Sequence, residues 1–163
     1  MTSTMHLPQR WIALLAFVGC GLLSIIAGTT EAVAQADDKA AAMTVLTSAL
    51  DAYNAGDVEH FFQDMHPMAT SFGAYGDRMI AGSDSASLSE SVAAGYKTNL
   101  AFEDLDLVFF DDAACVTGYL TGAVTLPEGE PESVVWRLTV MLIKEEGQWK
   151  MVHTHSSPMA SED

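Results

Sequence analysis

The spacing of apolar residues changes once along this chain, and that change limits the fold more than any other feature. Before position 100, apolar side chains recur at helical spacing, as Met43, Leu46, Leu50 and Tyr53 do. After it they alternate with period two, which predicts strands. The runs are Phe102–Phe110, Ala113–Leu126, Ser133–Lys144 and Gln148–Ser156. Helices first and strands second is an order typical of the α+β class.

Capping residues and short connections refine this expectation. We expect one helix between Asp37 and Gly56, a second, short helix that Asp57 caps, and a third that starts at Ser83 or Asp84. The four strands are joined by two to six residues, too few for the crossover that parallel neighbours need. The sequence therefore predicts three helices over one face of a curved, mostly antiparallel sheet.

The N-terminal region has the pattern of a secretory signal peptide. Arg10 is the only formally charged side chain among the first 30 residues, and the apolar run Trp11–Gly28 follows it. Small residues then fit cleavage after Ala34 or Ala36. An uncleaved anchor is the alternative, because 18 apolar residues approach the length that spans a bilayer.

Cleavage would leave an exported protein, periplasmic or secreted, with no stable membrane association. We expect a signal peptide over residues 1–36, one domain over 37–158 and a flexible tail over 159–163. Cys115 would be the only cysteine left, so no internal disulfide is expected. With 7 basic and 22 acidic residues, the formal net charge is -15. Such a surface repels phosphate backbones, which excludes nucleic acid as a partner.

The run from Val134 to Ile143 is apolar on both faces of its predicted strand. One face carries Trp136, Leu138, Val140 and Leu142, and the other carries Arg137, Thr139, Met141 and Ile143. Helices can cover only one face, so a second copy of the chain is the simplest cover for the other. We expect a homodimer, formed through the row that contains Trp136.

Two histidines stand out in the last strand. Strict alternation places Trp149, Met151, His153, His155 and Ser157 on one face. Imidazoles can act as acids, bases or metal ligands, although both side chains could equally be hydrogen-bonded core or interface residues. The sequence offers no clear third ligand beside this pair, so we expect no metal and no cofactor.

Arg137 is the anomaly of the preceding strand, since a guanidinium among apolar neighbours needs a carboxylate, carbonyls or an anionic ligand. We expect it to face the concave surface together with His153 and His155, as the electrostatic anchor of a pocket. The acidic clusters are expected at turns and on solvated faces.

Several segments carry a resemblance to a known family. They are Ala52-Tyr53, Ala55-Gly56-Asp57, Asp112–Val116, Arg137-Leu138-Thr139 and Gly147–Ser157. Over about residues 40 to 158 the chain resembles the nuclear transport factor 2-like superfamily. Within it, the chain is most similar to the SnoaL-like group that also resembles the association domain of calcium/calmodulin-dependent protein kinase. This implies a cone of three helices against a curved sheet, usually dimeric, with a pocket between helices and sheet.

The resemblance also implies residues for that pocket. Arg137, His153 and His155 match positions that line or border it, and Tyr53 and Tyr96 could reach it. Trp149 completes the set of candidate ligand-binding residues. The same fold serves enzymes and assembly modules. We expect a non-catalytic module for a small anionic or partly apolar ligand.

The alternative is an isomerase, cyclase or dehydratase that acts on a small, partly apolar carbonyl compound. His153 or His155 would then be the general acid and base. No residue matches the catalytic aspartate of the ketosteroid isomerase branch, which favours the binding module.

Overall fold

The computed structural model describes residues 16–75, 80–81 and 85–159, with side chains from residue 33 onward except at 80 and 81. The chain divides into two units, residues 1–39 and 40–163. Helix α1 (Ala16–Ala55) begins in the first unit and ends in the second. Among the described helices, none is apolar over enough of its length to cross a membrane.

The helices differ from the expected ones mainly at the first. Helix α1 already begins at Ala16, so the expected start at Asp37 is wrong. Asp37 and Asp38 lie inside a continuous helix, among alanines that favour it. Helix α2 (Val58–Gln63) has the predicted cap, with Asp57 accepting from the backbone N–H of His60 at 3.2 Å. Helix α3 (Ser85–Ala93) follows, and its expected first residues lie outside the described ones.

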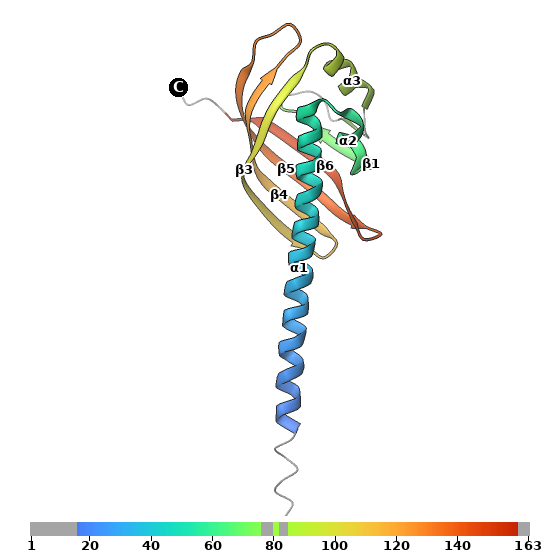
Figure 1. Cartoon of the computed structure of the whole chain (residues 1–163), viewed down its shortest axis with the longest axis vertical. Coiled ribbons are helices and arrows are strands. Elements are labelled where there is room, and N and C mark those ends of the chain that lie inside the picture. Colours follow the sequence, from blue (N-terminus) through green and yellow to red (C-terminus); the bar gives the residue numbers. More distant parts are fainter. Residues whose placement is uncertain (1–15, 76–79, 82–84, 160–163) are drawn as a thin grey trace, which may run out of the picture. The chain divides into compact units, whose positions relative to one another are not determined.

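The second unit contains a six-stranded sheet in the order β2-β1-β6-β5-β4-β3. The strands are β1 (Met65–Phe72), β2 (Ile80–Ala81), β3 (Lys97–Phe110), β4 (Ala113–Thr125), β5 (Glu132–Glu145) and β6 (Gln148–Pro158). Among the described strands, only β1 and β6 pair in parallel. The four predicted antiparallel strands are confirmed as β3 to β6 (Figure 1). Helices followed by a curved, mostly antiparallel sheet confirm the α+β class.

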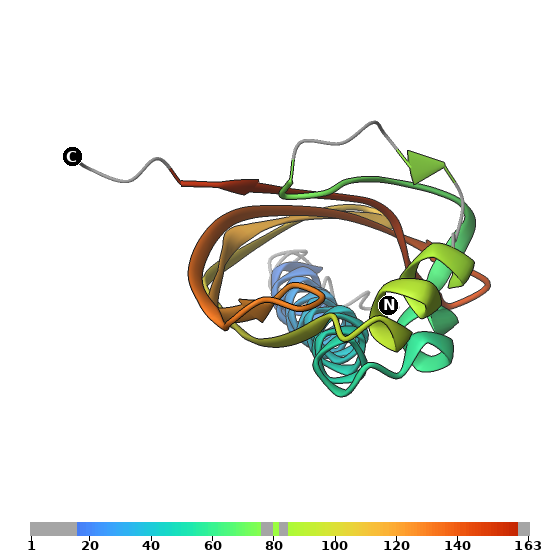
Figure 2. The same ribbon diagram turned by 90° about the horizontal axis from the view of Figure 1, so that it is seen from above.

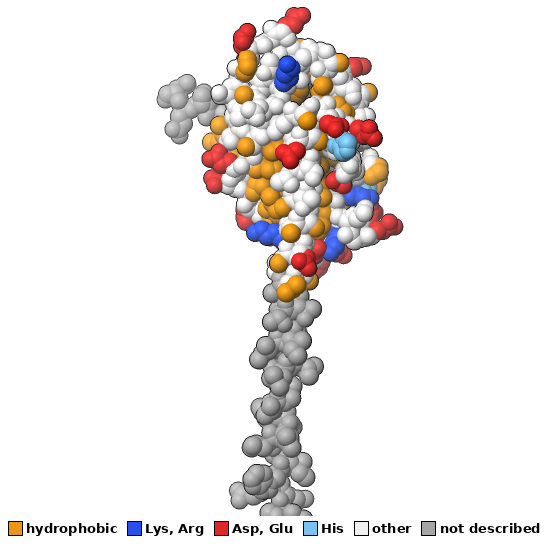
Figure 3. All heavy atoms as spheres, viewed as in Figure 1, with side chains coloured by type: hydrophobic (Ala, Val, Ile, Leu, Met, Phe, Trp, Pro, Cys, Tyr) orange, Lys and Arg blue, Asp and Glu red, His pale blue; other side chains and the backbone are white. Residues whose placement is uncertain are grey.

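The sheet curves around the C-terminal part of α1 (Figure 2), and the core of the second unit lies between them. Leu46 of α1 and Leu142 of β5 belong to this core, at 2% and 0% exposure. Figure 3 shows hydrophobic side chains gathered beside α1 over the sheet. We call the face of the sheet that meets α1 the concave face, and the opposite one the outer face.

The row expected to form a dimer interface belongs to the concave face. Trp136, Leu138, Val140 and Leu142 are all buried in the core cluster with residues of α1. The expectation that this row meets a second copy is therefore wrong. Alternation separates the two faces of a strand, but it does not tell which of two apolar faces the helices cover.

A β-bulge interrupts β6 at one residue. Met141 of β5 pairs with His153, whereas the next residue, Leu142, pairs with Met151. Val152 is thus the extra residue, and it reverses the alternation of every side chain after it. Trp149 and Met151 are buried on the concave side, but His153 and His155 are not.

Candidate functional site

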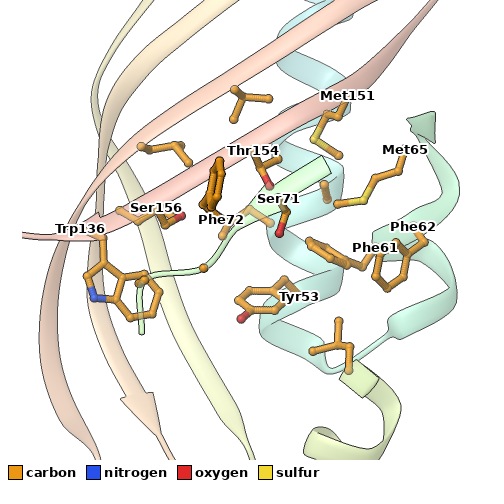
Figure 4. Close-up of a pocket in the computed structure, with 18 of the residues that line it drawn as sticks. Tyr53, Phe61, Phe62, Met65, Ser71, Phe72, Trp136, Met151, Thr154 and Ser156 are labelled. Atoms are coloured by element: carbon orange, nitrogen blue, oxygen red, sulfur yellow. The ribbon is translucent and has the colours of Figure 1, made fainter. Parts of the chain in front are cut away.

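A cavity of about 390 Å³ lies between the concave face, the end of α1, α2, α3 and the segment that follows β1 (Figure 4). Most of its lining is apolar. The apolar lining residues include Leu46, Leu50, Phe61, Phe62, Met65, Leu88, Phe102, Leu120, Trp136, Leu138, Val140 and Met151. This volume falls in the range of small-molecule sites.

Apart from the indole of Trp136, the polar side chains that line the described cavity carry hydroxyls. The hydroxyl groups of Tyr53 on α1 and Tyr96 are hydrogen-bonded to each other, with 2.7 Å between their oxygen atoms. Ser71, Thr154 and Ser156 contribute from β1 and β6 (Figure 4). No Asp, Glu, Lys, Arg or His is among the described residues that line this cavity. It can therefore solvate a hydrogen-bonding group of a ligand but cannot neutralise a ligand charge.

Burial keeps the two tyrosines neutral. It raises the pKa of Tyr53 strongly, and the neighbouring Tyr96 adds to that shift. The pKa of Tyr96 is also raised by burial, although its hydrogen bond with Tyr53 acts in the opposite direction. Both phenols therefore remain hydrogen-bond donors and acceptors at neutral pH and into the alkaline range.

This shift predicts a loss of stability at alkaline pH. The unfolded chain ionises Tyr53 near pH 10 while the folded chain does not, so the stabilisation present below about pH 10 is lost as pH rises. Urea unfolding at about pH 9 and 11 should show a shallower decline for Tyr53→Phe than for the parent chain. Tyr119→Phe, on the outer face of β4, is the control and should keep the parent slope. Equal slopes for all three chains would contradict the buried, neutral phenol.

The predicted site residues separate into three places. Tyr53 and Tyr96 line the cavity, which places them where the sequence expected them; their role in binding stays a prediction. Trp149 is 3% exposed and packs edge-on against Phe109, with ring centroids 5.6 Å apart. It is a core residue that does not line the cavity.

Arg137, His153 and His155 share one face, as predicted, but that face is the outer one. Arg137 is exposed and pairs with Ser157, on the side opposite to Trp136 and Leu138. The bulge at Val152 places the histidines on the same side. Their expected position in the concave pocket is therefore wrong, and Arg137 is not the anchor of the cavity.

The histidines border a second hollow instead. It measures about 420 Å³ and is more open than the cavity. Its lining consists of Phe72, Gly73, Ala74, His153, His155, Ser156, Ser157 and Pro158. Phe72 and Ser156 line both spaces, so the two are neighbours across the β1–β6 pair.

Sequence reasoning missed the wall that β5 contributes to the cavity. Trp136, Leu138 and Val140 line it from the concave face. The ring of Tyr75 contacts that of Trp136 edge-to-face, with 5.7 Å between the ring centroids, and Tyr75 also lines the cavity. The only signal in the sequence was the all-apolar row itself, which was equally compatible with a subunit interface.

Comparison with known proteins identifies the family. The family model for the SnoaL-like domain matches residues 42–161. The chain belongs to the SnoaL-like domain family. This confirms the predicted resemblance. Among curated proteins, none matches the sequence.

Solved structures with this fold carry different names. A ketosteroid isomerase-like protein from Erwinia carotovora atroseptica SCRI1043 is 20% identical, with a TM-score of 0.65 over 74% of this chain and 95% of that one. An NTF2-like protein from Cytophaga hutchinsonii ATCC 33406 is 14% identical, with a TM-score of 0.61 over 72% and 94%. The association domain of C. elegans CaMKII is 22% identical, with a TM-score of 0.59 over 76% and 95%. At such identities the likeness shows the fold of this SnoaL-like protein.

Proposed function

We propose that this SnoaL-like protein is an exported module that binds a small, uncharged and largely apolar molecule in the cavity. The observation that carries the proposal is the lining: mostly apolar walls with hydroxyl groups, among them the hydrogen-bonded phenols of Tyr53 and Tyr96, and no charged side chain among the described lining residues. A ligand with a carbonyl or hydroxyl group at one end and an apolar body fits these properties. An anionic ligand does not fit them, because Arg137 lies on the outer face.

The same lining favours binding over catalysis. General acid–base catalysis needs a group that exchanges a proton near the working pH. Burial moves Tyr53 and Tyr96 away from that range. The alternative, an isomerase, cyclase or dehydratase with a histidine as acid and base, would require His153 or His155 to reach a substrate in the cavity. Both face the opposite side of the sheet.

Titration of the full chain with prodan, an uncharged fluorescent naphthalene ketone, tests this proposal. We expect a blue-shifted emission and saturable binding, because the ketone can accept a hydrogen bond from the tyrosine pair. Tyr96→Phe should weaken binding about fivefold, the loss of one net hydrogen bond. Tyr119→Phe removes the same hydroxyl from the outer face of β4 and is the matched control.

Two further results would contradict the proposal. One is a tighter affinity for 2-naphthoate than for prodan, since a carboxylate finds no cation in the cavity. The other is equal binding of prodan by the parent chain and by Tyr53→Phe/Tyr96→Phe, which would place the probe elsewhere.

We also propose self-association, through the part of the outer face on β3 and β4. Phe110 and Val108 are 63% and 46% exposed there, and Val108 pairs with Cys115 across the two strands. An apolar patch of this kind is typical of an interface. One protein of the same fold is called an association domain, that of C. elegans CaMKII, and this name supports the proposal of self-association.

Light scattering should therefore give the mass of a dimer at micromolar concentration. Phe110→Asp should shift the protein to the monomer, because it places a charge in the contact. Met68→Asp changes a residue that is 79% exposed on β1, which is separated from β3 and β4 by β6 and β5 in the strand order. This variant should leave the dimer intact. A parent chain that scatters as a monomer would contradict this interface.

Export is proposed from the N-terminal pattern of Arg10, the apolar run and the small residues before Ala36. The intact mass of the protein isolated from its own host tests it. Loss of the first 34 or 36 residues is expected, and a mass that includes Met1 would contradict cleavage.

A further inference from the structure

Two imidazoles lie together in the outer hollow, which neighbours the proposed ligand cavity across the β1–β6 pair. His153 and His155 are two positions apart on β6, and both follow the bulge, so their side chains share the outer face. The ring of Phe72 contacts both edge-on, at 5.8 Å from His153 and 5.7 Å from His155 between centroids. One aromatic ring thus borders the two imidazoles on the β1 side.

Both imidazole rings have a nitrogen atom without a hydrogen-bond partner among the described residues. His153 Nδ1 is 2.8 Å from the hydroxyl of Thr70, which fixes the ring and leaves Nε2 without a partner among the described residues. His155 makes no hydrogen bond within the described part of the chain. By contrast, His60 pairs with Asp57 at 2.7 Å, and His66 faces Glu145 at 3.8 Å.

Neutral imidazole nitrogen is a preferred ligand of zinc, copper and nickel ions. Residues two apart on a strand are separated by roughly 6.6 Å along it, and one ion about 2.0–2.1 Å from each nitrogen can connect two such rings. A second hydrogen bond that orients the ring is typical of metal-binding histidines, and His153 can make it by donating its Nδ1–H to the Thr70 hydroxyl, which leaves Nε2 as the acceptor nitrogen.

We propose that the outer hollow binds one divalent late transition-metal ion through His153 Nε2 and an imidazole nitrogen of His155. Copper(II) is the ion that this nitrogen pair holds most tightly. No group of three or more His, Cys, Asp and Glu side chains comes together among the described residues. Water therefore completes the coordination, and the hollow leaves room for it.

Charge favours a cation over an anion here. The formal charge of -15 attracts cations to the protein and repels anions. Two basic side chains of the outer face are nearest in register. Lys150, which is paired with Glu145, lies two pairs before the His153–Met141 pair. Arg137 on β5 is opposite Ser157 and therefore two pairs beyond the His155–Thr139 pair. It is exposed, so solvent screens its repulsion of the ion. Thr70 and Phe72, which face the histidines from β1, carry no charge.

Calorimetric titration of the full chain with Cu²⁺, and separately with Zn²⁺, tests the site. We expect saturable binding at about pH 7.5, tighter for Cu²⁺ than for Zn²⁺. His155→Ala and His153→Gln should each weaken Cu²⁺ binding at least about tenfold, and Thr70→Val should weaken it about tenfold through the orientation of His153. The electron paramagnetic resonance spectrum of bound Cu²⁺ should show two nitrogen ligands.

The other three histidines of the sequence provide matched controls. His6→Gln, His60→Gln and His66→Gln should each bind Cu²⁺ as the parent chain does. Equal Cu²⁺ affinity for the parent chain and for His153→Gln/His155→Gln would overturn the site. Loss of Cu²⁺ affinity in one of the control variants would also overturn it. So would a paramagnetic resonance spectrum of bound Cu²⁺ that does not show two nitrogen ligands. Prodan binding is independent of this result, because the histidines do not line the cavity.

Discussion

Gly122→Ala should lower the free energy of unfolding by about 3 kcal/mol, the upper end of the usual cost of a strained backbone position. Gly122 lies within β4 at a φ of +144°, which residues with a side chain rarely adopt. An added Cβ would overlap the carbonyl oxygen of Asn99 on β3 and lie 3.1 Å from Leu100 Cα. Both neighbours are backbone atoms of a paired strand, so they cannot move aside without breaking the ladder.

Urea unfolding followed by circular dichroism measures this loss. Gly73→Ala is the matched control, because its added Cβ meets nothing within 4 Å and its φ is not positive. We expect that substitution to change stability by about 0.5 kcal/mol or less. If the two variants unfolded at the same urea concentration, this result would contradict the close approach of β3 and β4 at Gly122.

Ala49→Phe should abolish prodan binding, with affinity reduced at least about a hundredfold, while the protein remains folded. Ala49 is 7% exposed and borders the cavity from α1. A phenyl ring there occupies space that the ligand needs, and the cavity of about 390 Å³ can accept it. Filling an existing cavity adds apolar contacts instead of removing them, so no large loss of stability is expected.

Ser48→Phe places the same ring on the exposed neighbour of Ala49 and serves as the control. It should bind prodan like the parent chain. Retained binding in Ala49→Phe would show that the probe does not enter the cavity. Melting curves of both variants show whether either has lost its fold.

The order and type of the elements could be predicted from residue spacing alone. The change from helical to alternating spacing near Leu100 predicted helices first and four antiparallel strands next, and these are present. The sequence also predicted that Arg137 and His155 share a face. It could not predict which face α1 covers, because Leu138 and Met141 on opposite sides of β5 are both apolar.

The candidate site was harder to predict, because it depends on one inserted residue. Val152 is an apolar, β-branched residue that fits a regular strand, and neither Gly nor Pro marks the bulge. Reading the alternation through it assigned His153 to the side of Met151. Tyr53 and Tyr96 were predicted from the pocket that the family resemblance implies, and both lie before the bulge, which does not affect their position.

The bulge in β6 also bears on how this protein could change. If Val152 were instead paired within the ladder, every later residue of β6 would shift by one pair, and His153 and His155 would fall on the side now occupied by Met151. A one-pair shift in the register of β5 and β6 could thus exchange hydroxyl groups for imidazoles inside the cavity without any substitution in its wall. Among proteins that share this fold at low identity, gain and loss of acid–base chemistry can therefore follow the register of one strand as well as the identity of its residues.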